Sequence, residues 1–167
     1  MTGVLAYIGL GSNLDEPLGQ LHKALDELAR MPATSLSRHS SFYSTPPWGP
    51  VAQADFVNAV AEIRTQLPAR QLLEELLAIE HRAGRVRGGE RWGPRIIDLD
   101  LLVHGDARID EAGLCVPHPR MLERAFVLVP LAELDPELDL PGYGRIAGHL
   151  ARLDVGTCRK ISDATDS

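Results

Sequence analysis

The spacing of apolar residues changes between the period of a strand and the period of a helix along the chain, and this order limits the folds open to it. Apolar residues at positions 57, 59, 61 and 63 share one face of an alternating stretch, which predicts a strand over residues 56–65. Leucines at positions 18, 21, 25 and 28 recur at helical spacing and predict a helix over residues 17–31. Further strands are predicted over 4–10, 34–44 and 96–103, and further helices over 68–83, 119–134 and 144–153.

Glycine and proline set the breaks between these elements. Residues 11–13 are predicted to turn, with Ser12 or Asn13 capping the next helix, and residues 104–106 to turn toward a hairpin partner around 107–109. Pro130 is expected to kink or interrupt its helix, because proline lacks a backbone N–H. The irregular order of strands and helices predicts the α+β class, a mostly antiparallel sheet with helices packed on it.

The length of 167 residues suits one domain. We expect residues 1–153 to form that domain and residues 154–167 to be a frayed C-terminal tail. No stretch is long and apolar enough to cross a membrane, and residues 1–10 lack the basic region and cleavage site of a signal peptide. A cytoplasmic protein is therefore expected, and nothing in the sequence demands more than a monomer.

The net charge of −6 argues against a nucleic-acid partner, because such proteins usually carry a basic face. The two cysteines are too few for a disulfide framework, and Cys115 with His118 lacks the further ligands of a zinc site. The positive charge is nevertheless uneven. Arginines at positions 85, 87, 91 and 95 crowd into one glycine-rich stretch, which suggests a small anionic ligand, although on charge alone a solvated loop is the favoured interpretation.

Asp98 and Asp100 are the strongest local signal. On a strand both carboxylates point to one face, while Leu99 and Leu101 point into the core. A cation between them would relieve their repulsion, and oxygen ligands suit Mg²⁺ with substrate phosphates. Alone, such a pair is a weak signal and fits a half-exposed strand with a polar outer face somewhat better. The arginine-rich stretch runs directly into it, however, and this combination of metal ligands and cations is what phosphoryl transfer requires.

Aromatic residues and one amide indicate a second kind of contact. Phe56 and Asn58 share a strand face, Trp48 lies in a proline-rich loop just before them, and Phe126 lies further along the chain. Two rings and an amide are how proteins hold a flat polar heterocycle, although each ring on its own is more often part of a core. His118 lies between prolines and precedes Arg120 and Arg124, which makes a phosphate contact possible. Glu80 is either solvated or orients an Arg or His.

Taken together, the motifs resemble those of the 6-hydroxymethyl-7,8-dihydropterin pyrophosphokinase family. The resemblance covers about residues 5–153 and rests on the blocks YIGLGSN, FYSTPPWG, FVNA, RWGPR followed by DLD, VPHPR and ERAF. It implies a ferredoxin-like α+β sandwich, and a reaction that moves pyrophosphate from ATP to the hydroxymethyl group of the pterin and releases AMP. It also implies two Mg²⁺ ions.

The resemblance implies roles for individual residues. Asp98 and Asp100 would hold the metal, and Arg85 and Arg95 would join them in catalysis. The implied ATP-binding residues are Arg85, Arg87, Trp92, Arg95, Leu101, His118 and Arg124. The implied pterin-binding residues are Thr45, Pro46, Trp48, Phe56, Asn58, Asp98 and Phe126. The sequence departs from the family pattern at Phe56, Gly88 and Pro119, where Tyr, Lys and Tyr are found in other members; these departures bear on individual contacts, not on the reaction.

Two other functions share part of this pattern. Another Mg-dependent nucleotidyl- or phosphoryl-transfer enzyme would use the aspartates without needing the ring pocket. A non-catalytic nucleotide-binding module would bind ATP without a second substrate and would tolerate the loss of Asp98.

Overall fold

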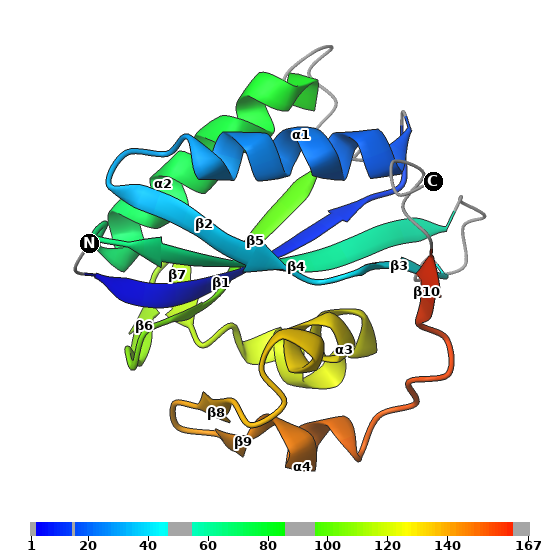
Figure 1. Cartoon of the computed structure of the whole chain (residues 1–167). Helices are drawn as coiled ribbons and strands as arrows, with labels where there is room; N and C mark the ends of the chain where they lie inside the picture. The colour runs from blue at the N-terminus through cyan, green and yellow to red at the C-terminus, as the bar shows by residue number, and fades with distance from the viewer. Residues whose placement is uncertain (1–2, 15, 47–54, 86–95, 162–167) are drawn as a thin grey trace.

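The computed structural model describes residues 3–14, 16–46, 55–85 and 96–161. Its centre is a six-stranded antiparallel sheet in the order β10-β3-β4-β1-β5, with β2 and β3 following one another along the same edge of β4 (Figure 1). The strands of this sheet are β1 (Val4–Ser12), β2 (Thr34–His39), β3 (Phe42–Thr45), β4 (Phe56–Thr65), β5 (Asp98–His104) and β10 (Arg159–Ile161). The α+β class predicted from the element order is confirmed.

Helices cover both faces of the sheet. In Figure 1, α1 and α2 lie on one face and α3 on the other, with α4 and a small sheet beyond α3. The helices are α1 (Pro17–Ala29), α2 (Ala69–Glu80) with a π-helical turn (His81–Arg85), a 3₁₀ helix (Pro119–Glu123), α3 (Ala125–Leu134) and α4 (Ile146–Leu150). The two small sheets pair β6 (Ile109–Glu111) with β7 (Leu114–Val116) and β8 (Asp139–Leu140) with β9 (Gly144–Arg145).

This layering gives the protein two cores. Ile8, Leu21 and Leu72 are fully buried in the core under α1 and α2. Val60 and Leu128 are fully buried in the core under α3. Full burial of such a side chain stabilises the folded state by about 1.5–3 kcal/mol, so both cores hold the helices against the sheet.

The first turn comes later than predicted. β1 extends through Ser12 instead of ending at Leu10, because it keeps pairing with β4 as far as Val57. The predicted cap by Ser12 or Asn13 is wrong: the N-cap of α1 is Glu16, which makes no side-chain capping hydrogen bond. The Ser12 hydroxyl donates to main-chain carbonyls instead.

Two predicted strand connections also differ from the structure. The single strand over 34–44 is split into β2 and β3, because Ser40 leaves the ladder and exchanges hydrogen bonds with the main chain of Val60. Residues 107–109 do not return along β5. Gly105, at φ 55°, donates its N–H to Leu5 at 2.8 Å and sends the chain across the end of β1, so β5 remains an edge strand.

The C-terminal third needs further corrections. The predicted helix over 119–134 breaks at Arg124, whose backbone is extended (φ −118°, ψ 102°), while Pro130 lies inside α3. The last predicted helix is shorter, since residues 144–145 form β9. The tail expected to fray after residue 153 contributes β10, which pairs with β3. Among the described residues, no helix is both long and apolar enough to span a bilayer.

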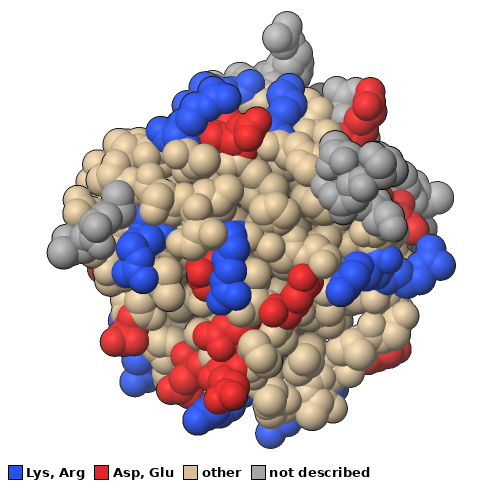
Figure 2. Space-filling view, in the orientation of Figure 1, with Lys and Arg blue, Asp and Glu red and all other residues tan. Residues whose placement is uncertain are grey.

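Charged side chains are distributed in separate groups over the surface. On the face drawn in Figure 2, the basic side chains of the described residues lie in several patches, and acidic side chains separate or adjoin them. The ion pairs joining Arg70 to Glu111 and Arg82 to Glu27, both at 2.8 Å, involve exposed side chains. Such pairs are worth little for stability, so burial and the sheet ladder carry the fold.

A carboxylate anchors α3 to β3 and to the residue just before it. Glu133 accepts hydrogen bonds from the main chain and hydroxyl of Ser41 and, at 2.6 Å, from the hydroxyl of Tyr43 on β3. Charge-assisted bonds of this kind are stronger than neutral ones. They fix the last turn of the helix whose first turn carries Phe126.

A second carboxylate is buried beneath α3. Glu62 is 6% exposed and accepts hydrogen bonds from the hydroxyl of Tyr7 at 2.9 Å and from the guanidinium of Arg38 at 3.1 Å. Burial raises the pKa of Glu62, but the bonds from Arg38 and Tyr7 outweigh it and hold that pKa below its ordinary value. Its contribution to stability is therefore present at neutral pH and is lost as the pH falls through the lowered pKa.

Replacing Glu62 by Ala removes the acceptor of a buried hydroxyl. We expect Glu62→Ala to lower the free energy of unfolding by about 1–3 kcal/mol, the usual cost of leaving a buried polar group unsatisfied. Tyr7→Phe removes that hydroxyl, so the double variant should lose less than the sum of the two single losses. Urea unfolding of the four proteins measures this, and strictly additive losses would contradict the coupling.

Candidate functional site

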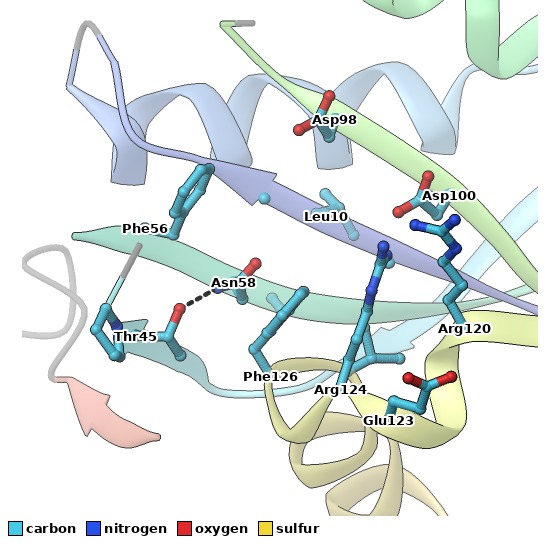
Figure 3. A pocket seen from close by; sticks show the side chains of 15 residues that line it. Leu10, Thr45, Phe56, Asn58, Asp98, Asp100, Arg120, Glu123, Arg124 and Phe126 are labelled. Carbon is cyan, nitrogen blue, oxygen red and sulfur yellow. Dashed lines mark hydrogen bonds between the residues drawn. The ribbon is translucent and has the colours of Figure 1, made fainter. Parts of the chain in front are cut away.

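A cavity of about 540 Å³ opens between the sheet and the start of α3. Figure 3 shows its side chains arriving from β1, β3, β4 and β5 on the sheet side and from the 3₁₀ helix and α3 on the other. The residues lining it are Gly9, Leu10, Gly11, Thr45, Pro46, Phe56, Asn58, Ala59, Asp98, Asp100, Arg120, Glu123, Arg124, Phe126 and Val127. Acidic and basic groups lie toward one end, and rings with an amide toward the other.

The acidic wall comes from β5. Asp98 and Asp100 are both partly buried and face the cavity, as the alternation of a strand predicts. Leu99, between them, is 4% exposed and packs in the core under α1 and α2. The prediction that the two carboxylates share one face is therefore confirmed.

Two arginines face this wall across the cavity. Arg120 comes from the 3₁₀ helix and Arg124 from the break before α3, and in Figure 3 both side chains extend from below toward β5 and Asp100. The Arg124 guanidinium carbon also lies 5.7 Å from the centroid of the Phe126 ring, within range of a cation–π interaction. The space between these two guanidinium groups and the two carboxylates can accommodate an anion together with a bound cation.

His118 lies just outside the lining of the cavity. Its Nδ1 accepts a hydrogen bond from the N–H of Arg120 at 3.2 Å, so a neutral ring carries its proton on Nε2. Burial lowers the pKa of His118, nearby Arg124 and Arg120 lower it further, and Asp100 opposes the shift. The imidazole is therefore neutral at neutral pH and serves as a donor.

The other end of the cavity is built for a ring. Phe56 comes from β4 and Phe126 from α3, and Pro46 follows the end of β3. Asn58 is only 6% exposed, and its Nδ2 donates to the hydroxyl of Thr45 at 2.6 Å (Figure 3). The Asn58 Oδ1 is the atom turned toward Gly11 of β1.

Gly11 forms the floor between the two ends. The strand register places Asn58, Gly11 and Asp98 in one row across β4, β1 and β5. Neighbouring strands lie about 4.8 Å apart, so the main chains of Asn58 and Asp98 are separated by about 10 Å with no side chain between them. A Cβ on Gly11 would come within 2.7 Å of the Asn58 Oδ1, whereas a Cβ on Gly9 would make ordinary contact with Leu102 at 3.5 Å.

The structure brings some of the predicted site residues together, while others lie outside its described residues. It brings together Thr45, Pro46, Phe56, Asn58, Asp98, Asp100, Arg124 and Phe126 around the cavity. Arg87, Trp92, Arg95 and Trp48 lie outside the described residues, and of Arg85 only the backbone, in the π-helical turn, is described. The Leu101 side chain is 4% exposed in the core under α1 and α2, as the alternation of the strand predicts, and it does not line the cavity. The ATP contact implied for Leu101 stays a prediction.

Some lining residues had no predicted role. Glu123 and Gly11 both face the cavity, and Arg120 was noted only for its closeness to His118. Positions 120, 123 and 124 share one side of a helical turn, a spacing that could have grouped them. Gly11 was predicted to lie in a turn. The alternation of the strand could have placed it on the cavity face instead, because Gly9 and Gly11 are two residues apart and share one face.

The sequence of this chain matches a known protein family and several of its members. The model of a family described as 7,8-dihydro-6-hydroxymethylpterin-pyrophosphokinase matches residues 7–136. The 2-amino-4-hydroxy-6-hydroxymethyldihydropteridine pyrophosphokinase of Haemophilus influenzae is 49% identical over 138 residues, which is 83% of this chain and 86% of that protein. The Pseudomonas aeruginosa protein of the same name is 50% identical over 135 residues, 81% of this chain and 83% of that protein.

Solved structures support the fold. Two Plasmodium falciparum HPPK-DHPS crystal structures superimpose with TM-scores of 0.75 and 0.70 at 14% and 13% sequence identity. The matches cover 96% and 90% of this chain, but only 49% and 45% of those longer chains, so this chain spans about half their length. At such low identity the likeness shows the fold alone, and the predicted ferredoxin-like α+β sandwich is confirmed.

The contact between Gly11 and Asn58 gives a direct test of the floor. We expect Gly11→Ala to displace the Asn58 amide and disturb its bond to Thr45, because the added Cβ would lie 2.7 Å from the Asn58 Oδ1. The side-chain amide resonance of Asn58 in ¹H–¹⁵N spectra should shift and exchange faster with solvent. Gly19→Ala, on the exposed side of α1 with only Glu16 near, is the matched control. An unchanged Asn58 resonance in Gly11→Ala would contradict the packing.

Proposed function

The chain belongs to the 7,8-dihydro-6-hydroxymethylpterin-pyrophosphokinase family, and from that premise we propose which residues carry out its reaction. The reaction transfers pyrophosphate from ATP to the hydroxymethyl group of 6-hydroxymethyl-7,8-dihydropterin in folate biosynthesis and releases AMP. The observation that carries the proposal is a single cavity with a ring-binding end and a charged end, joined over Gly11.

The pterin occupies the end with the amide and the rings. Phe56 and Phe126 stack on the faces of the heterocycle, and Asn58 reads its edge. The Asn58 nitrogen already donates to Thr45, so the amide is held in one orientation before the ligand arrives. An amide that is already held in place loses less conformational entropy when the ligand binds. It also disfavours rings whose edge lacks the matching hydrogen-bonding groups.

The triphosphate occupies the charged end. Arg120 and Arg124 offer planar donor groups that match phosphate oxygens, and His118 adds a neutral donor. Because Gly11 has no side chain, the hydroxymethyl group of the pterin can extend over it from the Asn58 end of the cavity toward Asp98. This alignment supports direct transfer, in which the reacting groups are held close and in line.

Magnesium fits the acidic wall. Mg²⁺ prefers oxygen ligands and is commonly held by one or two carboxylates together with substrate phosphates and waters. Within the described part of the chain, no group of three or more His, Cys, Asp or Glu residues could hold a metal ion. We therefore propose that Asp98 and Asp100 bind two Mg²⁺ ions jointly with ATP. When bound, the metal neutralises phosphate charge and aligns the phosphates.

The chain's own residues then align and stabilise the reacting groups. The hydroxymethyl oxygen bonds to the β-phosphorus of ATP, the bond from that phosphorus to the oxygen bridging the α-phosphate breaks, and AMP leaves with this oxygen while the hydroxyl proton is released. Arg120 and Arg124 stabilise the charge that shifts toward the leaving oxygen. We retain Arg85 and Arg95 as catalytic residues, Arg87 and Trp92 as ATP contacts, and Trp48 as a pterin contact.

We also propose the setting of this reaction. The protein acts in the cytoplasm, where ATP is available to a biosynthetic step, and works as a monomer with a single catalytic domain over residues 1–153. No nucleic-acid partner is proposed for a chain with a net charge of −6.

Product analysis tests the proposed function. The protein is incubated with Mg-ATP and 6-hydroxymethyl-7,8-dihydropterin, and the nucleotides are separated. AMP formed in step with a pyrophosphorylated pterin supports the proposal. ADP would indicate transfer of a single phosphoryl group by another kind of enzyme, and ATP binding without pterin-dependent turnover would indicate a nucleotide-binding module.

Asp100→Asn tests the metal assignment. The amide keeps the shape of the side chain but loses the charge, so we expect kcat for AMP formation to fall about 100- to 1,000-fold while the protein stays folded. Asp106→Asn is the matched control, because Asp106 is exposed on the turn after the same strand. Wild-type turnover in a folded Asp100→Asn protein would refute the role of this carboxylate.

A further inference from the structure

A third carboxylate lies close to the aspartate pair but faces away from the cavity. Glu80 is the last residue of α2 and is only 3% exposed. Its Oε2 accepts a hydrogen bond from the main-chain N–H of Leu99 at 2.7 Å. Leu99 is the residue between Asp98 and Asp100, so Glu80 contacts the backbone of the acidic wall from behind.

The position of β5 explains why this bond matters. β5 is the edge strand of the central sheet and pairs with β1 on one side only. N–H groups of successive residues in a strand point to opposite edges. The Leu99 N–H is turned away from β1, and α2 supplies the acceptor that a neighbouring strand would otherwise provide.

The burial of Glu80 is costly for a carboxylate. Glutamate is almost never fully buried unless it is paired, because taking a carboxylate out of water costs free energy. This one also adds negative charge behind Asp98 and Asp100, which already repel each other. A role in stability alone would be served by a neutral acceptor, so the strength of a charge-assisted bond at this point indicates a role in the site.

The bond fixes the peptide that carries Asp98. The Leu99 nitrogen belongs to the peptide plane that starts at the Asp98 carbonyl, and the Leu99 side chain is held in the core on the same face as α2. With both held, the stretch of the edge strand that carries Asp98 and Asp100 is fixed in position beside the cavity. Displacement of a positioning element by about 1 Å can cost 100-fold in rate.

We propose that Glu80 is a positioning residue that holds the Asp98–Asp100 segment of β5 in the geometry needed to bind Mg-ATP. This inference rests on the proposed metal site at these two aspartates. Glu80 does not contact substrate or metal; it acts through the main chain of Leu99. Outer residues that orient metal ligands typically change metal affinity by about 10- to 100-fold when replaced.

The test compares Glu80→Ala with Glu80→Gln. The Gln amide oxygen can accept the bond from Leu99, whereas Ala cannot, and Glu74→Ala on the exposed side of the same helix is the control. Calorimetry with α,β-methylene-ATP, which resists pyrophosphoryl transfer, measures nucleotide affinity across a series of Mg²⁺ concentrations. Hydrogen exchange measures the protection of the Leu99 amide.

We expect Glu80→Ala to speed exchange of the Leu99 amide and to raise the Mg²⁺ concentration for half-maximal analogue binding by about 10- to 100-fold. Its kcat should fall, while its affinity for the pterin stays at the wild-type value. Glu74→Ala should resemble the wild type in all four readouts. Glu80→Gln keeps an acceptor but loses its charge, so its changes should run in the same direction as those of Glu80→Ala and be smaller. If Glu80→Ala does not fold, Glu80→Asp, which withdraws the carboxylate by one methylene, should show the same changes.

Lower thermal stability of Glu80→Ala with an unchanged Mg²⁺ requirement and kcat would overturn the inference and leave Glu80 a structural residue. Asp100→Asn in the same titration separates this result from a failure of the proposed function. If Asp100→Asn weakens Mg²⁺-dependent binding and Glu80→Ala does not, only the role of Glu80 fails. If neither variant changes the Mg²⁺ requirement, the metal assignment fails as well.

Discussion

The register of β1 against both of its neighbours is the constraint on which the site depends. It sets Asn58, Gly11 and Asp98 in one row, so that the Asn58 amide and the Asp98 carboxylate face the same cavity from main chains about 10 Å apart. A slip of one residue on either side would turn one of these side chains into the core under α1 and α2. The buried apolar residues that alternate with them are what make such a slip costly.

The helices on the two faces of the sheet have different roles around the cavity. α1 and α2 fill the core behind the cavity, and Glu80 at the end of α2 reaches the edge strand there. α3 and the 3₁₀ helix cover the front and bring Phe126 and two arginines over the sheet. Glu133 ties the far end of α3 to β3, so both walls of the ring-binding end are joined by charge-assisted bonds.

Alternation and composition predicted much of this from sequence. Asp98 and Asp100 had to share a face once the strand was recognised, and the apolar residues of β4 fixed which face Asn58 and Phe56 occupy. What sequence reasoning missed depends on contacts between distant segments. Gly11 looked like a turn residue because only its approach to Asn58 explains a glycine inside a strand. The bond from Leu99 to Glu80 joins residues 19 positions apart and has no local signal.

The central claim is that one cavity holds both substrates, with the pterin over Gly11 between the rings and the triphosphate between the aspartates and the arginines. A crystal structure with 6-hydroxymethyl-7,8-dihydropterin, Mg²⁺ and α,β-methylene-ATP tests it most directly. The account predicts the pterin stacked between Phe56 and Phe126 with its edge at Asn58, its hydroxymethyl oxygen facing the β-phosphorus, and metal at Asp98 and Asp100. A pterin bound away from this row, or phosphates without metal at the two aspartates, would contradict it.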